Sequence, residues 1–401
     1  MSGDPGGGSA LPPASPPPVA PADKTLYVTR PDLPPLDELL PALQAIWHSH
    51  QLTNNGPFHQ RLEAELCRFL DVPALSLFCN GTIALLAAIQ SLGLQGEVIT
   101  TPYSFVATTH ALRWAGLTPV FADIEPDTFT LDPQRLEAAL TPRTSAILPV
   151  HVYGHPCDHA AIQAFADAHG LKVLYDSAHA FGVRGGTGPD GHALRQANLL
   201  RQGDLAVLSF HATKVFNTFE GGAVVSASRD AKLQIDRLKN FGFVNEVTVD
   251  ALGINGKMNE LQAAVGCLQL PRFDALNARR AAADVCYRQL LAGVPGLQLP
   301  PQPTVAVHNH GYFPLQVTPA FGCSRDALYQ RLREAGILAR RYFYPLISDF
   351  PMYTAMPGAA PDNLPVARRV AQQVLCLPLY AELDEADCRR VVQVILNAAA
   401  G

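Results

Sequence analysis

Short apolar or β-branched runs alternate with segments of helical periodicity between residues 74 and 228. This alternation predicts an α/β fold, in which helices cover both faces of a mostly parallel, seven-stranded sheet. The connection from Phe210 to Gly221 is shorter than the roughly twelve residues of a helical crossover, which allows the last strand to run antiparallel to its neighbours. The expected strands read ALSLFCN, EVITT, TPVFADI, SAILPVH, KVLYD, LAVLSF and GGAVVSA.

The flanking segments divide the chain into three parts. Residues 1–23 consist almost entirely of Gly, Pro, Ala and Ser, which bury too little apolar surface to become ordered, so we expect a disordered tail. Residues 24–270 form the expected large domain that contains the sheet. A long helical stretch with Pro271 as its predicted break leads into residues 271–401, the expected bridging helix and smaller C-terminal α+β domain.

Composition narrows the class of protein. The chain has 401 residues, 48% hydrophobic and 16% charged, so it can bury a large core. Its net charge of −5 argues against nucleic acid or an anionic membrane as a partner, because both attract clustered Lys and Arg. Eight cysteines lack a Cys-x-x-Cys pair, and neither a secretion signal nor an apolar run of roughly 20 residues is visible. We therefore expect a cytoplasmic protein.

Polar residues with distinct chemistry follow three of the expected strands, where ligands bind in open α/β sheets. The strand ALSLF leads to Asn80-Gly81-Thr82 and then to an apolar helix, so the backbone amides at the helix start suit a phosphate. Taken alone, this motif fits an ordinary helix capped by Asn80 better than a phosphate site.

The other two strand ends carry a carboxylate and a lysine. Asp176 follows KVLY, with His179 three residues later, and a buried carboxylate at such a position requires a cationic or donor partner. Ser209 and Lys214 follow LAVL. Taken singly, Asp176 fits a helix cap and Lys214 fits a surface lysine that extends its amine to water.

Taken together, these strand ends indicate pyridoxal 5′-phosphate. That cofactor requires a lysine that joins its aldehyde, a carboxylate that keeps its pyridine nitrogen protonated, a helix N-terminus for its phosphate and an aromatic face against its ring. Phe105, in TTPYSFVAT, is the aromatic candidate, with an ordinary core position as the alternative.

The ordered set of motifs from about residue 25 to 397 resembles the DegT/DnrJ/EryC1/StrS family of pyridoxal-phosphate-dependent sugar aminotransferases. The resemblance implies the aspartate aminotransferase-like fold, also called fold type I of these enzymes. Its segments are LTNNGPFHQRLE, NGTIALLAAI, ITTPYSFVAT, FADIEPDTFTLDP, PVHVYGHPCD, LYDSAHAFG, SFHATKVFNTFEGG, INGKMNELQAAVG and CLPLY.

The resemblance implies a role for each matching residue. Lys214 would hold the cofactor covalently and move protons, and Asp176 would pair with the pyridine nitrogen. His179 would replace the family's usual Gln beside the phenolic oxygen, and Phe105 would cover the ring. Gly81, Thr82 and Ser209 would hold the phosphate, with Asn255 reaching it from a neighbouring subunit, which implies a homodimer with shared active sites.

Two departures affect substrate recognition. Lys257 stands where the family usually has Arg, which keeps the charge but loses a bidentate fork. The stretch RYFYPLI replaces a family His-Tyr-x-Pro-Leu-His, leaving Arg340, Arg341 and Tyr344 as candidate substrate contacts; a solvated surface position fits either arginine equally well. His211 and Glu220 receive no role.

The resemblance implies transfer of an amino group from glutamate to a nucleotide-linked 4-keto-6-deoxysugar, with a dTDP-linked sugar closest to the pattern. Glutamate would leave as 2-oxoglutarate, and the cofactor would pass through pyridoxamine 5′-phosphate. The alternatives are the same chemistry on a 3-keto-6-deoxysugar, or a non-catalytic sensor that binds the cofactor. Some relatives are dehydratases with histidine in place of the lysine, but Lys214 is present here.

A metal site is the remaining alternative. HVYGHPCDH places His151, His155, Cys157 and His159 within nine residues, a set of side chains that can ligate zinc. Because Gly154 and Pro156 indicate a loop, and the related V-H-x-Y-G turn of the family needs no metal, we expect none.

Overall fold

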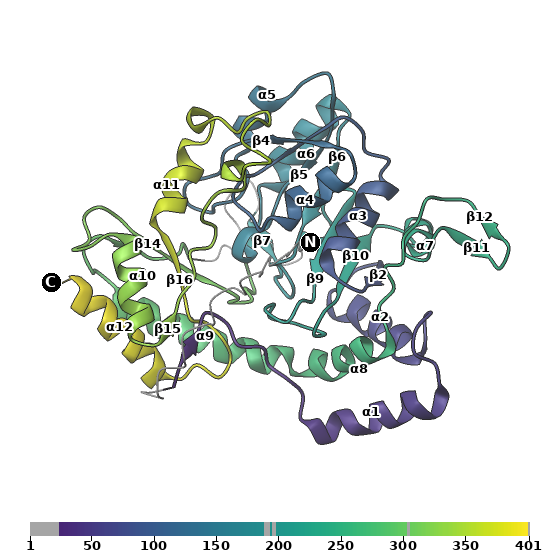
Figure 1. Cartoon of the computed structure of the whole chain (residues 1–401), viewed down its shortest axis with the longest axis horizontal. Coiled ribbons are helices and arrows are strands. Elements are labelled where there is room, and N and C mark those ends of the chain that lie inside the picture. Colours follow the sequence, from purple (N-terminus) through teal and green to yellow (C-terminus); the bar gives the residue numbers. More distant parts are fainter. Residues whose placement is uncertain (1–23, 188–192, 195–197, 303–304, 400–401) are drawn as a thin grey trace, which may run out of the picture.

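The computed structural model describes residues 24–187, 193–194, 198–302 and 305–399; the predicted disordered tail lies outside the described residues. A seven-stranded sheet forms the centre of the molecule, in the order β2-β10-β9-β6-β5-β3-β4 (Figure 1). All neighbouring strands pair in parallel except around β10, which is antiparallel to both β2 and β9. The strands are β2 (Ala74–Phe78), β3 (Glu97–Thr100), β4 (Thr118–Phe121), β5 (Thr144–Leu148), β6 (Lys172–Asp176), β9 (Leu205–Ser209) and β10 (Gly222–Ser226).

Helices cover both faces of the sheet, as the sequence predicted. Alternate residues of β9 show why, since Leu205 and Val207 belong to one core cluster whereas Ala206 and Leu208 belong to another. The first cluster includes side chains of α3 (Gly81–Ser91), α4 (Ala107–Trp114) and α7 (Arg229–Leu238). The second includes side chains of α2 (Pro57–Phe69), α6 (His159–His169) and α8 (Glu260–Gln269).

The predicted break at Pro271 is confirmed. Helix α8 ends at Gln269, a single 3-10 turn covers Leu270–Arg272, and helix α9 (Phe273–Leu291) follows. Proline has no amide hydrogen to continue the α-helical ladder, but it fits the first turn of the next helix.

The C-terminal part has its own core around a three-stranded antiparallel sheet in the order β13-β14-β16. Residue Leu26 belongs to this core, because β1 pairs in parallel with β15. The division at residue 270 stays a prediction. The elements are β1 (Leu26–Tyr27), β13 (Leu297–Gln298), β14 (Phe313–Val317), α10 (Arg325–Glu334), β15 (Ile337–Leu338), α11 (Pro365–Gln373), β16 (Val374–Leu377) and α12 (Glu385–Ala399).

Smaller elements complete the chain. Helix α1 (Leu36–Ser49) and the two-stranded hairpin of β11 with β12 project from the body of the molecule on the same side (Figure 1). Within the described segments, no helix combines the length and the apolar character that crossing a bilayer demands. The other short elements are α5 (Leu136–Ala139), β7 (Gly186–Thr187), β8 (Ala193–Leu194), β11 (Phe243–Asn245) and β12 (Thr248–Val249).

Candidate active site

A cavity of about 550 Å³ lies beyond the carboxyl ends of the parallel strands β2, β6 and β9. Because these ends meet at one edge, residues far apart in the sequence converge there. His211 and Glu220 also line the cavity, with 3.6 Å between His211 Nε2 and Glu220 Oε1. The predicted residues that line it are Gly81, Thr82, Phe105, Asp176, His179, Ser209 and Lys214.

Lys214 lies in the loop between β9 and β10. Its backbone amide donates to the carbonyl of His211 at 2.8 Å, and its Nζ donates to the Tyr312 hydroxyl at 3.3 Å. Burial lowers the pKa of the Lys214 amine from 10.5 to about 8, although nearby Asp176 favours the charged form. Near pH 8 the amine therefore exists in both protonated and free forms, as a proton carrier requires.

Asp176 ends β6 with both carboxylate oxygens already bonded. Oδ2 accepts from the Thr108 hydroxyl at 2.7 Å, and Oδ1 accepts from the Ala178 amide at 3.0 Å. Burial raises the pKa of Asp176, while these two donors and the charge of Lys214 lower it. A cationic ring nitrogen entering the cavity would stabilise the buried carboxylate further.

His179 presents one defined donor. Its Nδ1 accepts from the amide of Tyr153 at 3.1 Å, so in the neutral ring Nε2 carries the hydrogen. Burial and the charge of Lys214 hold the pKa of His179 well below its usual value, which keeps the ring neutral. A neutral N–H donor can replace the amide donor of a Gln at this position.

The start of α3 lines the cavity at Asn80, Gly81 and Thr82. The Asn80 side chain caps α3 by accepting from the Ile83 amide at 2.9 Å. A Cβ added to Gly222 would lie 2.7 Å from the Gly81 amide nitrogen, and one added to Gly81 would lie 3.0 Å from Ser209 Cβ. These glycines therefore let the helix start approach Ser209 closely, and the capped helix N-terminus suits a phosphate.

Phe105 lies just before α4 at the mouth of the cavity. Its side chain is 58% exposed in the single chain, so an aromatic face remains free to cover a bound ring. The alternative of a core phenylalanine is wrong for Phe105.

A family model described as the DegT/DnrJ/EryC1/StrS aminotransferase family matches residues 36–396. The chain belongs to this aminotransferase family. The predicted fold is also confirmed, because the solved structures that match along the chain include aminotransferases with the same architecture. The family and these structural neighbours are pyridoxal-phosphate-dependent aminotransferases.

Relatives of this aminotransferase act on nucleotide sugars. It is 51% identical to a dTDP-4-amino-4,6-dideoxy-D-glucose transaminase of Shigella dysenteriae, over 93% of this chain and 99% of the relative. The structure of DesI in the presence of its TDP-sugar product matches with a TM-score of 0.85 and 38% identity, covering 94% of both chains. NtdA from Bacillus subtilis, with the cofactor PMP bound, matches with a TM-score of 0.80 and 27% identity, covering 91% of this chain and 82% of NtdA.

Three predicted substrate residues of this aminotransferase lie outside the set that lines the cavity. The backbone of Arg340 pairs with that of Cys376. Arg341 donates to Asp326 at 2.9 Å, and the Tyr344 ring lies 4.6 Å from the guanidinium carbon of Arg325. Neighbouring Tyr342 and Phe343 line the cavity instead.

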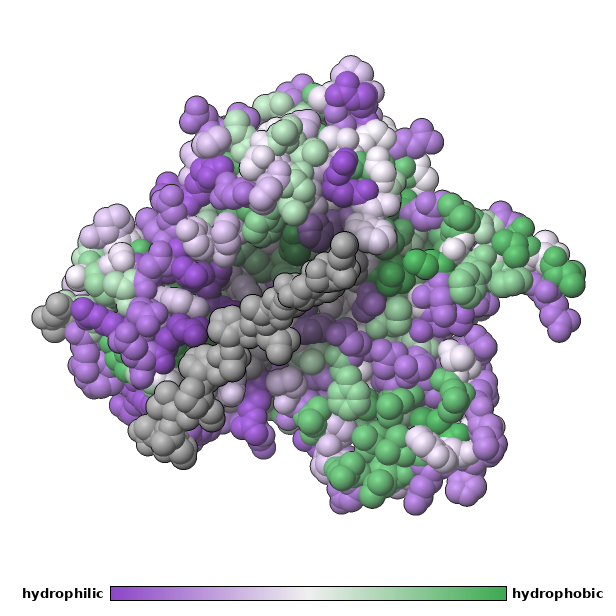
Figure 2. All heavy atoms as spheres, viewed as in Figure 1, coloured by the Kyte–Doolittle hydropathy of each residue, from purple (hydrophilic) through white to green (hydrophobic). Residues whose placement is uncertain are grey.

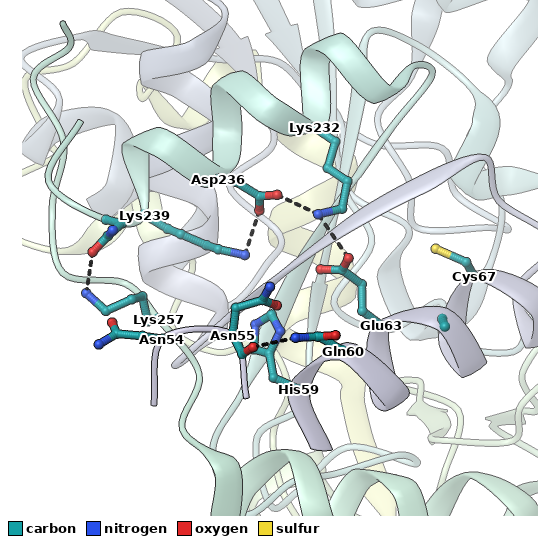
Figure 3. A pocket seen from close by; sticks show the side chains of 12 residues that line it. Asn54, Asn55, His59, Gln60, Glu63, Cys67, Lys232, Asp236, Lys239 and Lys257 are labelled. Atoms are coloured by element: carbon teal, nitrogen blue, oxygen red, sulfur yellow. Dashed lines mark hydrogen bonds and ion pairs between the residues drawn. The ribbon is translucent and has the colours of Figure 1, made fainter. Parts of the chain in front are cut away.

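Asn255 and Lys257 also lie away from the cavity. Lys257 lines a second cavity, where its Nζ donates to Asn240 Oδ1 at 2.8 Å (Figure 3). Several residues that line that cavity form ion pairs, including Lys239 with Asp236 at 2.6 Å. Asn255 is exposed, and its backbone pairs with that of Asn240. Its contact with a neighbouring subunit stays a prediction.

The sequence analysis gave no role to several cavity residues, among them Thr108, Tyr312, Tyr342 and Phe343. Thr108 lies three residues after Phe105, so helical spacing could have indicated it. The other three come from the C-terminal part. Tyr342 and Phe343 lie within RYFYPLI, but no local pattern indicates which side chains of that stretch line the cavity.

The histidine-rich turn packs as part of the core. The rings of His151 and Tyr175 are stacked with centroids 4.8 Å apart, and the His159 ring lies 5.0 Å from that of His151. Across the described segments, no three His, Cys, Asp or Glu side chains are grouped so that they could hold a metal ion.

Proposed function

We propose that this chain moves an amino group from glutamate to the C4 ketone of a dTDP-linked 4-keto-6-deoxysugar, with pyridoxal 5′-phosphate as cofactor. The observation that carries the proposal is the Lys214 amine, with a pKa of about 8, in one cavity with buried Asp176 and the capped start of α3. The 51% identical relative, which is named as a dTDP-4-amino-4,6-dideoxy-D-glucose transaminase, supports the C4 position and the nucleotide.

The residues of the cavity fit this cofactor. The bare amides of Gly81 and Thr82 and the Ser209 hydroxyl would hold the phosphate, and Phe105 would cover the ring. Asp176 would keep a proton on the ring nitrogen, and the N–H donor of His179 would suit the phenolic oxygen. When bound, the cofactor supplies an electron sink for the carbon that loses its proton.

Lys214 supplies the proton transfers. With a pKa of about 8, its Nζ takes a proton from the amino-bearing carbon of glutamate and delivers one to the sugar carbon in the second half of the reaction. Glutamate leaves as 2-oxoglutarate, whose keto oxygen comes from one water molecule. The amino group of glutamate ends on C4 of the sugar, and the ketone oxygen of the sugar leaves as water. Closely packed aromatic side chains beside Lys214, including Tyr312 and Phe343, limit the access of bulk water.

We also propose a homodimer with shared active sites. The hairpin of β11 and β12 exposes apolar side chains, as does α1; Val247 is 91% exposed and Trp47 70% exposed. Figure 2 shows apolar surface gathered over both elements. A second copy that covers these surfaces would bury them and bring the segment around Asn255 to its site.

Two measurements test the proposed function. Borohydride treatment of the protein loaded with pyridoxal phosphate should fix the cofactor on the peptide that contains Lys214, and Lys214→Ala should abolish this attachment. A panel of dTDP-linked 4-keto and 3-keto-6-deoxysugars should then give 2-oxoglutarate from glutamate only with the 4-keto compounds. Attachment without turnover of any ketosugar would favour the sensor, and turnover of the 3-keto sugars alone would refute the C4 assignment.

A further inference from the structure

Tyr312 meets Lys214 across the cavity, although 98 residues separate them in the sequence. The Lys214 Nζ donates to the Tyr312 hydroxyl at 3.3 Å. Tyr312 immediately precedes β14 of the C-terminal sheet, whereas Lys214 follows β9 of the central sheet. The contact therefore joins the two parts of the chain at the amine itself.

The loop before Tyr312 is fastened to the site. Asn309 Nδ2 donates to the carbonyls of His179 at 2.8 Å and Phe181 at 3.0 Å. Arg280 Nε in turn donates to the Asn309 carbonyl at 3.2 Å. Because Asn309 is almost fully buried, these bonds fix the loop, and with it the origin of the Tyr312 side chain.

The ring of Tyr312 is held by aromatic neighbours. Its centroid lies 4.7 Å from that of His179 and 5.3 Å from that of Tyr153. Burial raises the pKa of the Tyr312 phenol well above its usual value, so the hydroxyl stays neutral. A neutral hydroxyl can accept from the ammonium form of Lys214 and donate to its free amine, so the contact persists in both protonation states.

We propose that Tyr312 is a positioning residue, whose hydroxyl holds the Lys214 amine in one place while the amine gains and loses the transferred proton. The inference rests on the proposed role of Lys214 as the proton carrier. Without the hydroxyl, the flexible stem of the lysine lets the amine leave the geometry that proton transfer requires.

The test measures the Lys214 amine directly in the full chain without cofactor. Trace labelling with acetic anhydride across a pH series, followed by mass spectrometry of the Lys214 peptide, gives the titration midpoint of that amine. In the parent protein the midpoint should lie near pH 8. Tyr312→Phe keeps the ring but removes the hydroxyl. Because a hydrogen bond from the charged ammonium is stronger than one to the free amine, the midpoint should fall by about 0.5 to 1 unit. An unchanged midpoint would overturn the proposal.

Tyr342→Phe is the matched control for this labelling. It removes a phenol hydroxyl from the same cavity, its ring lies 6.2 Å from that of Tyr312, and no hydrogen bond joins it to Lys214 among the described residues. The Lys214 midpoint should stay at the parent value in this control. An equal fall in both variants would assign the effect to the general polarity of the cavity and would also overturn the proposal.

A second variant and a kinetic measurement complete the test. The variant covers the case in which Tyr312→Phe does not fold, and the kinetic measurement examines the loaded enzyme. Asn309→Ala keeps the Tyr312 hydroxyl but loosens the loop that carries it, so the Lys214 midpoint should fall by a smaller amount than in Tyr312→Phe. If Tyr312→Phe does not fold, an unchanged Lys214 midpoint in Asn309→Ala would refute the proposal. In the loaded enzyme, Tyr312→Phe should lower kcat about tenfold with little change in KM. Because the labelling needs neither cofactor nor substrate, it stays informative even if the proposed reaction proves wrong.

Discussion

Lys214 and Asp176 are held in the cavity at a cost to the stability of the folded chain. Burial disfavours the charged forms of both groups, lowering the pKa of the amine and raising that of the carboxyl. Their mutual attraction offsets only part of this cost, because desolvation is the largest cause of both shifts. A cofactor that pairs with Asp176 and joins Lys214 would lower the free-energy cost of burying these two groups. Cofactor binding would therefore stabilise the folded chain at these residues.

The lowered pKa of the Lys214 amine predicts how the stability of the folded chain depends on pH. Below pH 8 the amine is protonated in the folded and unfolded chains, and the folded chain bears the full cost of burying the charge. Between pH 8 and 10.5 the folded chain binds fewer protons than the unfolded chain, so the free energy of unfolding rises with pH. Lys214→Met should therefore stabilise the cofactor-free protein at pH 7 by about 2–3 kcal/mol more than it does near pH 10.5.

Denaturant unfolding at several pH values checks this prediction. Lys172→Met, at a lysine whose side chain is 52% exposed, controls for the loss of one positive charge. If the difference in unfolding free energy between Lys214→Met and the parent did not vary with pH, the pKa of the Lys214 amine could not be lowered in the folded chain.

At the scale of elements, the start of α3 links stability to phosphate binding. Asn80 holds the first turn in place, and that turn carries the amides proposed to bind phosphate. Asn80→Ala should lower the free energy of unfolding by about 1 kcal/mol, the usual value of a helix cap. It should also weaken the binding of pyridoxal phosphate, measured by absorbance titration, because the first turn frays.

Ser324 offers a matched control for the cap. It caps α10 by accepting from the Ala327 amide at 3.2 Å, and it does not line the cavity. Ser324→Ala should lower stability by a similar amount and leave the cofactor affinity unchanged. Equal affinities for Asn80→Ala and the parent would show that the order of this turn does not govern phosphate binding.

At the scale of the whole molecule, one chain holds Lys214 at a cavity and Asn255 on an exposed segment outside it. A dimer with shared sites would combine Lys214 of one chain with Asn255 of the other. The Lys214→Ala and Asn255→Ala proteins, each inactive alone, are dissociated, mixed and allowed to reassociate. Half of the randomly paired dimers then contain one chain of each kind and regain one intact site of two, so the mixture should reach up to roughly a quarter of parental activity.

The outcome depends on whether the two residues act across chains. If Asn255 served the site of its own chain, no mixed dimer would contain an intact site, and the activity would stay at the average of the two variants. Size-exclusion chromatography with light scattering provides the companion measurement of the dimer itself.

The central sheet and most of the proposed cofactor residues could be predicted because their signals are local. Alternating apolar runs predicted the seven strands, and a short connection indicated that β10 runs antiparallel. Asp176 ends β6, and Lys214 lies in the loop after the neighbouring strand β9. The parallel arrangement of these two strands is sufficient to bring both residues to one edge of the sheet. The sequence likewise marked Asn80 as a helix cap.

The substrate side of the cavity could not be predicted in this way. RYFYPLI drew attention to Arg341 and Tyr344, yet Arg341 pairs with Asp326, whereas Tyr342 and Phe343 face the cavity. Which side of an irregular segment faces a site depends on its packing against distant elements, because no helical or strand period fixes its orientation.

The sequence by itself therefore determined the strands, the Asn80 cap of α3 and the chemical groups at the sheet edge, since each depends on neighbours within a few residues. Only the tertiary structure decided that Tyr312 contacts the Lys214 amine, that Thr108 donates to Asp176, and which aromatic rings close the cavity. The Tyr312 contact and the aromatic rings of the cavity join segments that are far apart in the sequence. Their geometry depends on where the C-terminal part lies relative to the cavity, which local sequence patterns do not encode.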